Sequence, residues 1–133
     1  MRPPPLLPDS PCPCGRPLAY ARCCGCWHAG PQALQALTAE DLMRSRYSAF
    51  AAGLLDYLRD TWHPSTRPAA LEPLPPGLRW LGLEVRRHVA QDADHALVEF
   101  VARSKLGGQA RRLHETSRFV REGGRWFYVD GDE

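Results

Sequence analysis

Residues 11–28 read Pro-Cys-Pro-Cys-Gly-Arg-Pro-Leu-Ala-Tyr-Ala-Arg-Cys-Cys-Gly-Cys-Trp-His and contain all five cysteines of the 133-residue chain. Cys12 and Cys14 form one close pair, eight residues follow, and Cys23 and Cys24 then stand next to each other. Two close pairs of soft ligands suit a tetrahedral zinc ion. Because four thiolates would close the coordination shell, the stretch predicts a structural zinc site rather than an active site.

Three other uses of clustered cysteines fit this sequence less well. The first residues, Met-Arg-Pro-Pro-Pro-Leu-Leu-Pro, contain no apolar run of the length found in a signal peptide, which disfavours a secreted, disulfide-bonded domain. Prolines on both sides of the first cysteine pair disfavour a thioredoxin-type redox pair. The spacing also differs from the ferredoxin patterns of iron–sulfur ligands. We therefore expect the protein to reside in the reducing cytoplasm.

The choice of ligands within the cluster is open on spacing alone, because Cys26 and His28 compete with Cys24 for a position. The stretch resembles the SEC-C motif, a short zinc knuckle with a Cys-x-Cys pair, a loop, and then Cys-Cys or Cys-His. Arg16 and Pro17 stand where that motif usually has serine and glycine. The resemblance implies that the zinc ligands are Cys12, Cys14, Cys23 and Cys24.

Length and composition predict one ordinary domain plus a small appendage. Hydrophobic residues make up 44% and charged residues 24% of the chain, as in soluble globular proteins. We expect no membrane association, since no apolar run approaches the roughly 20 residues that span a bilayer. A formal net charge of +2 is too small to indicate nucleic-acid binding. We place the knuckle, with a flexible N-terminal lead, in residues 1–30 and a second domain in residues 31–133.

The first part of the second domain is predicted to be a pair of helices. Thr38 precedes two acidic residues in a pattern typical of a capping box, and an apolar stripe with helical spacing follows it. Gly53 is expected to end this helix. A second helix is predicted from about residue 54 to 62, because Pro64 restricts the residue before it and stops the helix. Residues 64–76 contain five prolines and should cross to the next part without helix.

The hydrophobic period then changes from that of a helix to the alternation of β-strands. Alternating runs occur near residues 81–89, 96–100, 113–119 and 125–130. Turn signals separate them at residues 91–94, 107–108 and 123–124, so the simplest topology is an antiparallel meander. Helices followed by such a meander predict an α+β fold with the helices on one face of a curved sheet.

Five stretches together resemble the YchJ family: the knuckle and residues 42–50, 61–68, 114–119 and 124–128. The resemblance covers nearly the whole chain. It implies a SEC-C knuckle joined to a nuclear transport factor 2-like domain, a cone of helices packed on a curved antiparallel sheet. It supplies no established reaction. Similar knuckles contact partners at the tail of the preprotein translocase ATPase, so we expect an interaction or adaptor module with a protein or ribosome-associated partner. Sheet-to-sheet homodimers are common in similar folds.

The alternative function is small-molecule binding or catalysis inside the cone, and the sequence leaves open whether the protein is an enzyme. His114 points away from the face that its neighbours Glu115 and Ser117 share, which disfavours a local catalytic triad. A purely structural role predicts instead a buried ion pair between Arg46 and Glu115. The candidate ligand-binding residues of the cone are Arg46, Trp62, His63, Glu115, Ser117 and Tyr128.

Overall fold

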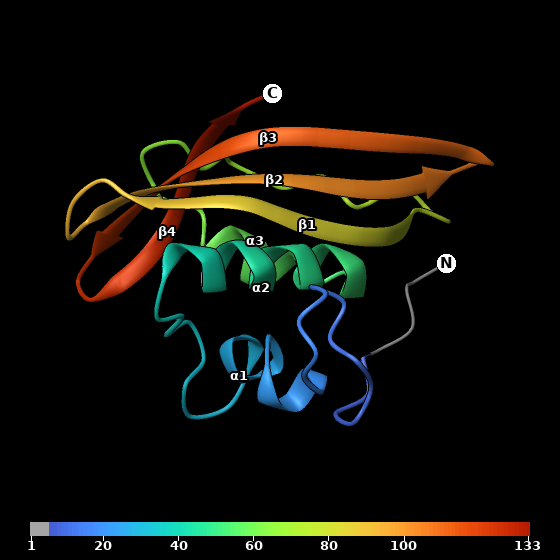
Figure 1. The fold of residues 1–133 in the computed structure, drawn as a ribbon, viewed down its shortest axis with the longest axis horizontal. Coiled ribbons are helices and arrows are strands. Elements are labelled where there is room, and N and C mark those ends of the chain that lie inside the picture. Colours follow the sequence, from blue (N-terminus) through green and yellow to red (C-terminus); the bar gives the residue numbers. More distant parts are fainter. Residues whose placement is uncertain (1–5) are drawn as a thin grey trace.

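Three helices lie below one face of a four-stranded antiparallel sheet in the computed structural model, which describes residues 6–133 (Figure 1). The expected N-terminal lead falls partly on residues 1–5, outside the described residues. The strands pair in chain order, as expected for a meander. Their bounds are Arg79–Ala90 (β1), His95–Leu106 (β2), Gln109–Glu122 (β3) and Arg125–Asp132 (β4). The predicted α+β fold is therefore confirmed.

The long helix α2, Ala39–Ala52, begins and ends where the sequence predicts. The Thr38 hydroxyl accepts a hydrogen bond from the Asp41 amide at 3.0 Å, which satisfies one of the free amides of the first turn. Gly53 ends the helix in a left-handed conformation with φ 73°. The next helix, α3, is shorter than expected and spans Leu55–Asp60.

Two short elements inside the knuckle were not predicted from the sequence. A single 3-10 turn, η1, spans Tyr20–Arg22, and a one-turn helix, α1, spans Gly25–His28. Neither has a side-chain cap or a fully buried residue, so local sequence preferences do not specify them. They follow from the backbone path that brings the cysteines together.

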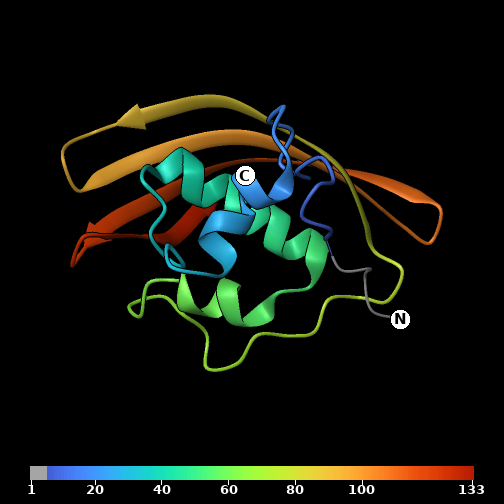
Figure 2. The same ribbon diagram turned by 90° about the horizontal axis from the view of Figure 1, so that it is seen from below.

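The strands are joined by tight turns, and the sheet curves around α2 (Figure 2). Gly107 and Gly108 both have positive φ, at 58° and 80°, and the Gly123–Gly124 pair repeats this conformation. Such angles define the type I′ turn that suits the twist of a two-residue hairpin. Register shifts between Val85 and Arg87 and between Arg118 and Phe119 interrupt the ladders, as bulges do in curved sheets.

The main core lies between α2 and the concave face of the sheet. Its buried members from α2 include Leu42, Met43 and Tyr47, and Val98 and Phe100 face them from β2. A second cluster lies on the α3 side of α2, around Tyr57, Leu58 and Ala49. In this arrangement of helices on a curved sheet, α2 is packed on two sides, against the sheet and against α3.

The segment after α3 attaches to the last strand. Trp62 forms a parallel bridge with Tyr128. The His63 amide donates to the Tyr128 carbonyl oxygen at 2.7 Å, and the Tyr128 amide donates to the Thr61 carbonyl oxygen at 2.8 Å. These bonds cover part of the outer edge of β4 and hold the start of the proline-rich crossing against the sheet.

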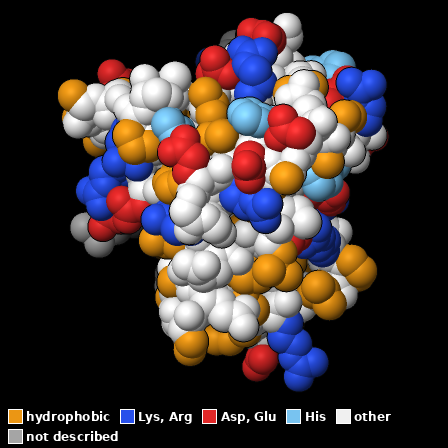
Figure 3. Space-filling view, turned by 90° about the vertical axis from the view of Figure 1, so that its left-hand side faces the viewer, with side chains coloured by type: hydrophobic (Ala, Val, Ile, Leu, Met, Phe, Trp, Pro, Cys, Tyr) orange, Lys and Arg blue, Asp and Glu red, His pale blue; other side chains and the backbone are white. Residues whose placement is uncertain are grey.

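The surface mixes charges of both signs. Figure 3 shows basic, acidic and histidine side chains interspersed over the upper part of one end of the molecule, while hydrophobic side chains are frequent in the lower part. This distribution agrees with the small formal net charge of +2. Among the helices of the described residues, none combines the length and the apolar character needed to cross a bilayer.

Candidate metal centre and ligand cavity

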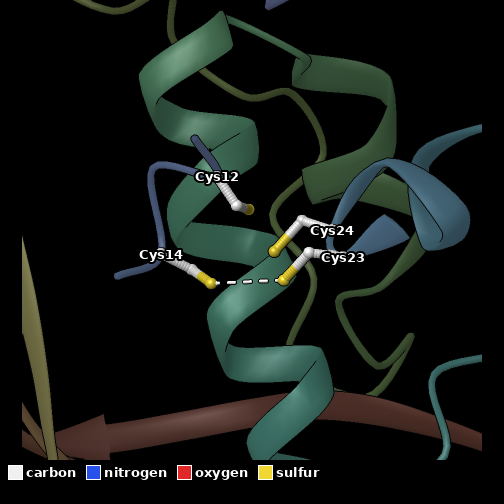
Figure 4. A group of neighbouring side chains, drawn as sticks. All are labelled: Cys12, Cys14, Cys23 and Cys24. Carbon is white, nitrogen blue, oxygen red and sulfur yellow. Dashed lines mark hydrogen bonds between the residues drawn. The ribbon is translucent and has the colours of Figure 1, made fainter. Parts of the chain in front are cut away.

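Four cysteines of the knuckle converge beside α2. The Sγ atoms of Cys12, Cys14, Cys23 and Cys24 all lie within 4.8 Å of one another (Figure 4). Each of these residues is at most 5% exposed. A tetrahedral zinc site with Zn–S bonds of about 2.3 Å places its sulfurs roughly 3.8 Å apart, so a small contraction would complete the site. The Sγ atoms of Cys14 and Cys23 are already 3.6 Å apart.

The pKa shifts of these thiols indicate that four thiolates require a bound cation. Burial raises the pKa of Cys23 to about 12, and the hydrogen bond with Cys12 helps to raise that of Cys24 as well. Hydrogen bonds from Cys14 and Cys24 lower the pKa of Cys12. Protein groups alone thus do not favour four thiolates at once, because several buried like charges repel. Four thiolates together require a soft cation, and the donor set fits zinc.

The two alternative ligands have other partners. The Cys26 thiol donates to the Ala21 carbonyl oxygen at 3.1 Å and is not among the four sulfurs that lie within 4.8 Å of one another. Both ring nitrogens of His28 are used: Nδ1 lies 2.5 Å from the Tyr20 hydroxyl and Nε2 lies 2.8 Å from the Ser45 carbonyl oxygen. The geometry thus favours Cys24 over either of them for the fourth position.

Polar contacts fasten the cluster to α2. The Cys12 thiol and the Ser48 hydroxyl lie 3.6 Å apart, and Arg44 Nη1 donates to the Cys14 carbonyl oxygen at 2.8 Å. Arg16, one of the two residues that depart from the SEC-C motif, pairs with Asp41 at 2.6 Å in the first turn of the helix. The knuckle therefore packs directly on the helix that also lines the cone.

A cavity of about 180 Å³ lies on the other side of α2, between this helix and the sheet. Arg46, Trp62, Glu115 and Tyr128, four of the six residues predicted for the cone, line it. The remaining lining residues are apolar or aromatic, and they are Met43, Tyr47, Phe50, Trp80, Phe100, Ala102, Leu113 and Phe119.

Arg46 is the basic group of this cavity and is only 6% exposed. Its Nη1 donates to the Leu58 carbonyl oxygen at 2.8 Å and to Thr61 Oγ1 at 2.7 Å, near the end of α3. Its guanidinium carbon lies 4.6 Å from the centre of the Tyr128 ring and 5.6 Å from that of Trp62. Burial lowers the pKa of Arg46 to about 10, so it stays charged at neutral pH.

The prediction of a direct ion pair between Arg46 and Glu115 is wrong. No salt bridge joins these two residues in the described part of the chain, although both line the cavity. Glu115 instead accepts a 2.5 Å hydrogen bond from the buried hydroxyl of Ser117, two residues along the same face of β3. The Leu58 carbonyl oxygen and the Thr61 hydroxyl, near the end of α3, satisfy part of the guanidinium, and sequence spacing does not reveal these partners.

Ser117 and His63 do not belong to the cavity lining. Ser117 contacts the lining residue Glu115, and the Nε2 of His63 lies 2.6 Å from Glu122. The Nδ1 of His63 lies 2.7 Å from the hydroxyl of Ser65, which gives a serine–histidine–carboxylate row. The amides of Thr66 and Arg67 both donate to the His63 carbonyl oxygen and cannot stabilise an oxyanion. The row is therefore a turn-stabilising contact.

His114 lies on the opposite face of β3, as strand alternation predicts. Its Nε2 is 2.7 Å from Glu99 on the neighbouring strand. The predicted separation of His114 from Glu115 and Ser117 is thus seen in the structure. Sequence reasoning missed Trp80, Arg44 and Ser48, although the helical spacing of Ser48 from Arg44 could have placed both on one face of α2.

Comparison with known proteins supports this description of the chain. Residues 38–131 match the family model described as the YchJ middle NTF2-like domain. The UPF0225 protein of Methylibium petroleiphilum is 64% identical, covering 96% of this chain and 95% of that protein. The UPF0225 protein of Bordetella parapertussis is 59% identical over 99% of this chain and 98% of its own length.

Two solved structures share the fold. A SEC-C motif containing protein from Rhodopseudomonas palustris, solved in solution, has a TM-score of 0.79 and 31% identity, with 92% of this chain and 98% of that chain covered. The crystal structure of a SEC-C motif containing protein from Psychrobacter arcticus has a TM-score of 0.76 and 32% identity, with 92% and 82% covered. By fold, sequence match and cysteine cluster, the chain belongs to the YchJ (UPF0225) family.

Proposed function

We propose that this protein binds a small ligand in the cavity between α2 and the sheet, and that its cysteine knuckle holds a structural zinc ion. The observation that carries this proposal is the presence of two opposite charges, on Arg46 and Glu115, in one largely aromatic cavity of about 180 Å³. A concave, apolar site with a few convergent polar groups is typical of small-molecule binding. A protein that used its fold only as a scaffold would fill this space with its own side chains.

The zinc ion has a supporting role in this proposal. Four buried thiolates would occupy every tetrahedral position and leave none for water or substrate. The contacts of the knuckle to Arg44 and Ser48 lie on the side of α2 that faces away from the cavity residue Arg46. The metal would then stabilise the helix that lines the cavity, without taking part in chemistry there.

Native purification from the cytoplasm of a bacterial host tests this proposal directly. We expect mass spectrometry under native conditions to show one zinc ion per chain and a co-purified small molecule that is lost after unfolding. The double variant C12S/C23S should lose the metal, whereas Cys26→Ser should keep it. Zinc well below one equivalent under reducing, metal-replete conditions would contradict the metal assignment.

A second candidate function is an adaptor that binds a protein or ribosome-associated partner through the knuckle. The observation in its favour is an outer groove of about 430 Å³, distinct from the cavity and lined in part by Pro8, Tyr20 and Cys26. Leu18, nearby in the sequence, is 45% exposed. If native purification recovers a stoichiometric protein partner that Leu18→Asp releases, and no small molecule, this second function replaces the first. A homodimer would appear in the same spectrum at twice the chain mass.

A further inference from the structure

We infer that the ligand of the cavity is a neutral, planar heterocycle that carries both a hydrogen-bond acceptor and an N–H donor on its rim. This inference rests on the proposed function and adds the chemical class of the ligand. It depends on three features of the cavity: its shape, its balance of charge, and the polar atoms that are free in it.

The shape of the cavity favours a flat, ring-sized ligand. Aromatic side chains line it from α2, from the segment after α3 and from the sheet, including Phe50, Trp62, Phe119 and Tyr128. Its volume of about 180 Å³ is close to that of an engineered cavity of about 150 Å³ that binds benzene. Aromatic walls bind a flat ring by offset stacking or by edge-to-face contact. A ligand of about one ring therefore fits.

The balance of charge favours a neutral ligand. Arg46 and Glu115 bring one positive and one negative group to the same cavity without pairing directly in the described structure. An anion would lie near the Glu115 carboxylate, and a cation would lie near the Arg46 guanidinium, so either would meet repulsion. A zwitterion would have to give up the hydration of two full charges in an apolar surrounding. A neutral ligand with polar edges avoids all three costs.

The free polar atoms define those edges. Within the described residues, all hydrogen bonds of Arg46 start at Nη1, which leaves the Nε and Nη2 donors for an acceptor of the ligand. The hydrogen bond found for Glu115 ends at Oε2, which leaves Oε1 to accept from an N–H group. A ring with a carbonyl group and an N–H group satisfies both residues at once.

The position of the Glu115 carboxylate is fixed by its neighbours. The Ser117 hydroxyl donates to it, and the Gly131 backbone of β4 packs so closely that a Cβ atom at this position would collide with the carboxylate. Gly131 needs no positive φ, so its missing side chain serves close approach rather than backbone freedom. The fold thus keeps space for this carboxylate at one edge of the cavity.

Titration of the nitrogen-15-labelled, zinc-loaded full chain with 2-pyridone tests the inference. This probe is a single neutral ring with a carbonyl group next to an N–H group. We expect shifts at the indoles of Trp62 and Trp80, with half-saturation at about millimolar concentration, as suits a small fragment. N-methyl-2-pyridone, in which a methyl group replaces the N–H hydrogen, cannot donate to Glu115 and should bind about 10-fold more weakly. Benzene and benzoate are the apolar and anionic controls.

Variants connect the binding to Glu115. Glu115→Met should weaken 2-pyridone about 10-fold, to the level of the N-methyl probe. Glu99→Met, on the outer face of β2, is the matched control and should leave binding unchanged. Gly131→Ala moves the carboxylate without removing it, and should weaken 2-pyridone even if Glu115→Met folds poorly.

The possible results separate the inference from the proposed function. If benzoate binds as tightly as 2-pyridone or more tightly, or if both pyridones bind equally well, the ligand is not a neutral ring with a donor and an acceptor. The proposal that the cavity binds a small ligand would then still stand. If none of the four probes shifts the cavity resonances of the folded protein, both the inference and the proposed binding of a small ligand in the cavity are wrong.

Discussion

His28 shows how a residue that looks like a metal ligand can serve the fold instead. Its ring is half-buried, with the Tyr20 hydroxyl on one nitrogen and the Tyr57 ring in a T-shaped contact whose ring centres are 4.6 Å apart. With Nε2 donating to the Ser45 carbonyl oxygen and Nδ1 accepting from the Tyr20 hydroxyl, both bonds are satisfied by the neutral ring. The histidine thus joins α1 to α2 without carrying charge.

This arrangement predicts a pH dependence of stability. Burial lowers the pKa of His28 below its ordinary value of 6.5, so the unfolded chain binds a proton more readily than the folded one. The free energy of unfolding should therefore fall as the pH drops below about 6.5. Urea unfolding of the zinc-loaded protein at several pH values measures this. His28→Gln should remove that part of the slope, and an unchanged slope would show that His28 is not buried in neutral form.

Gly25, like Gly131, has no side chain at a point where another part of the chain approaches closely. An added Cβ atom there would lie 2.7 Å from the Tyr20 carbonyl oxygen, which is backbone and cannot rotate away. We expect Gly25→Ala to lower the free energy of unfolding by about 1–3 kcal/mol through overpacking. Gly82→Ala is the control, because nothing lies within 4 Å of its added Cβ atom and Gly82 has no positive φ. A similar loss in both variants would contradict the steric explanation.

At the scale of elements, α2 joins the two candidate sites. Ser45 and Ser48 are fully buried and face the knuckle or the α3 side, while Arg46 and Tyr47 face the cavity. The helical stripe of the sequence predicted the apolar face of this helix, because packing against a sheet requires one. It could not predict the buried polar side, whose partners come from parts of the chain that are distant in sequence.

Strands and turns were the most predictable elements, because alternation and paired glycines are local signals. The structure extends each expected strand, for example from residues 96–100 to His95–Leu106 for β2.

The partner of Arg46 was mispredicted for the opposite reason, because it is set by contacts that are not local in the sequence. Opposite charges on facing elements suggested Glu115, whereas the observed acceptors are a backbone carbonyl oxygen and Thr61 at the end of α3. A backbone carbonyl oxygen does not appear in a pattern of side chains, and the threonine hydroxyl carries no charge that would mark it as a partner of Arg46.

The contact between Arg46 and Thr61 gives a prediction for α3. Thr61 is 1% exposed, and its hydroxyl both accepts from Arg46 and donates to the Tyr57 carbonyl oxygen at 2.7 Å. Thr61→Val keeps the shape and removes both bonds, so the free energy of unfolding should fall by about 1–3 kcal/mol. Chemical denaturation measures the loss. In an Arg46→Met background the same substitution should cost less, and an equal cost in both backgrounds would show that the two residues are not coupled.

At the scale of the whole molecule, the knuckle and the sheet pack on different sides of α2. The buried core of the second domain draws its members from α2 and the sheet, together with Ala36 just before α2. Among knuckle residues, Trp27 packs against that core while only partly buried. The four cysteines form a cluster of their own, with Leu83 of β1 packed against it. Trp27 and Leu83 thus connect the knuckle to the core, and the division into a metal-dependent knuckle and a domain with its own apolar core stays a prediction.

Metal removal should therefore affect the two parts differently. A stretch as short as residues 11–28 is too small for its own core and takes its folding free energy from the metal. We expect chelation to raise amide hydrogen exchange over residues 12–28 to the level of unfolded chain. Exchange in the centres of β2 and β3 should stay slow, because their ladders and the core beneath them contain no metal ligand. The melting temperature of the sheet should fall by a few degrees, since Ser48 and the other contacts of α2 to the knuckle become exposed.

The double variant C12S/C23S should reproduce the exchange pattern of the chelated protein, and Cys26→Ser should reproduce that of the untreated one. If chelation instead released the amides of β2 and β3 together with those of the knuckle, the chain would be one cooperative unit. The zinc ion would then hold α2 against the sheet as well as the knuckle against α2, and binding in the cavity would depend on the metal. Repeating the 2-pyridone titration on chelated protein distinguishes these two arrangements, because a separable knuckle leaves the cavity able to bind.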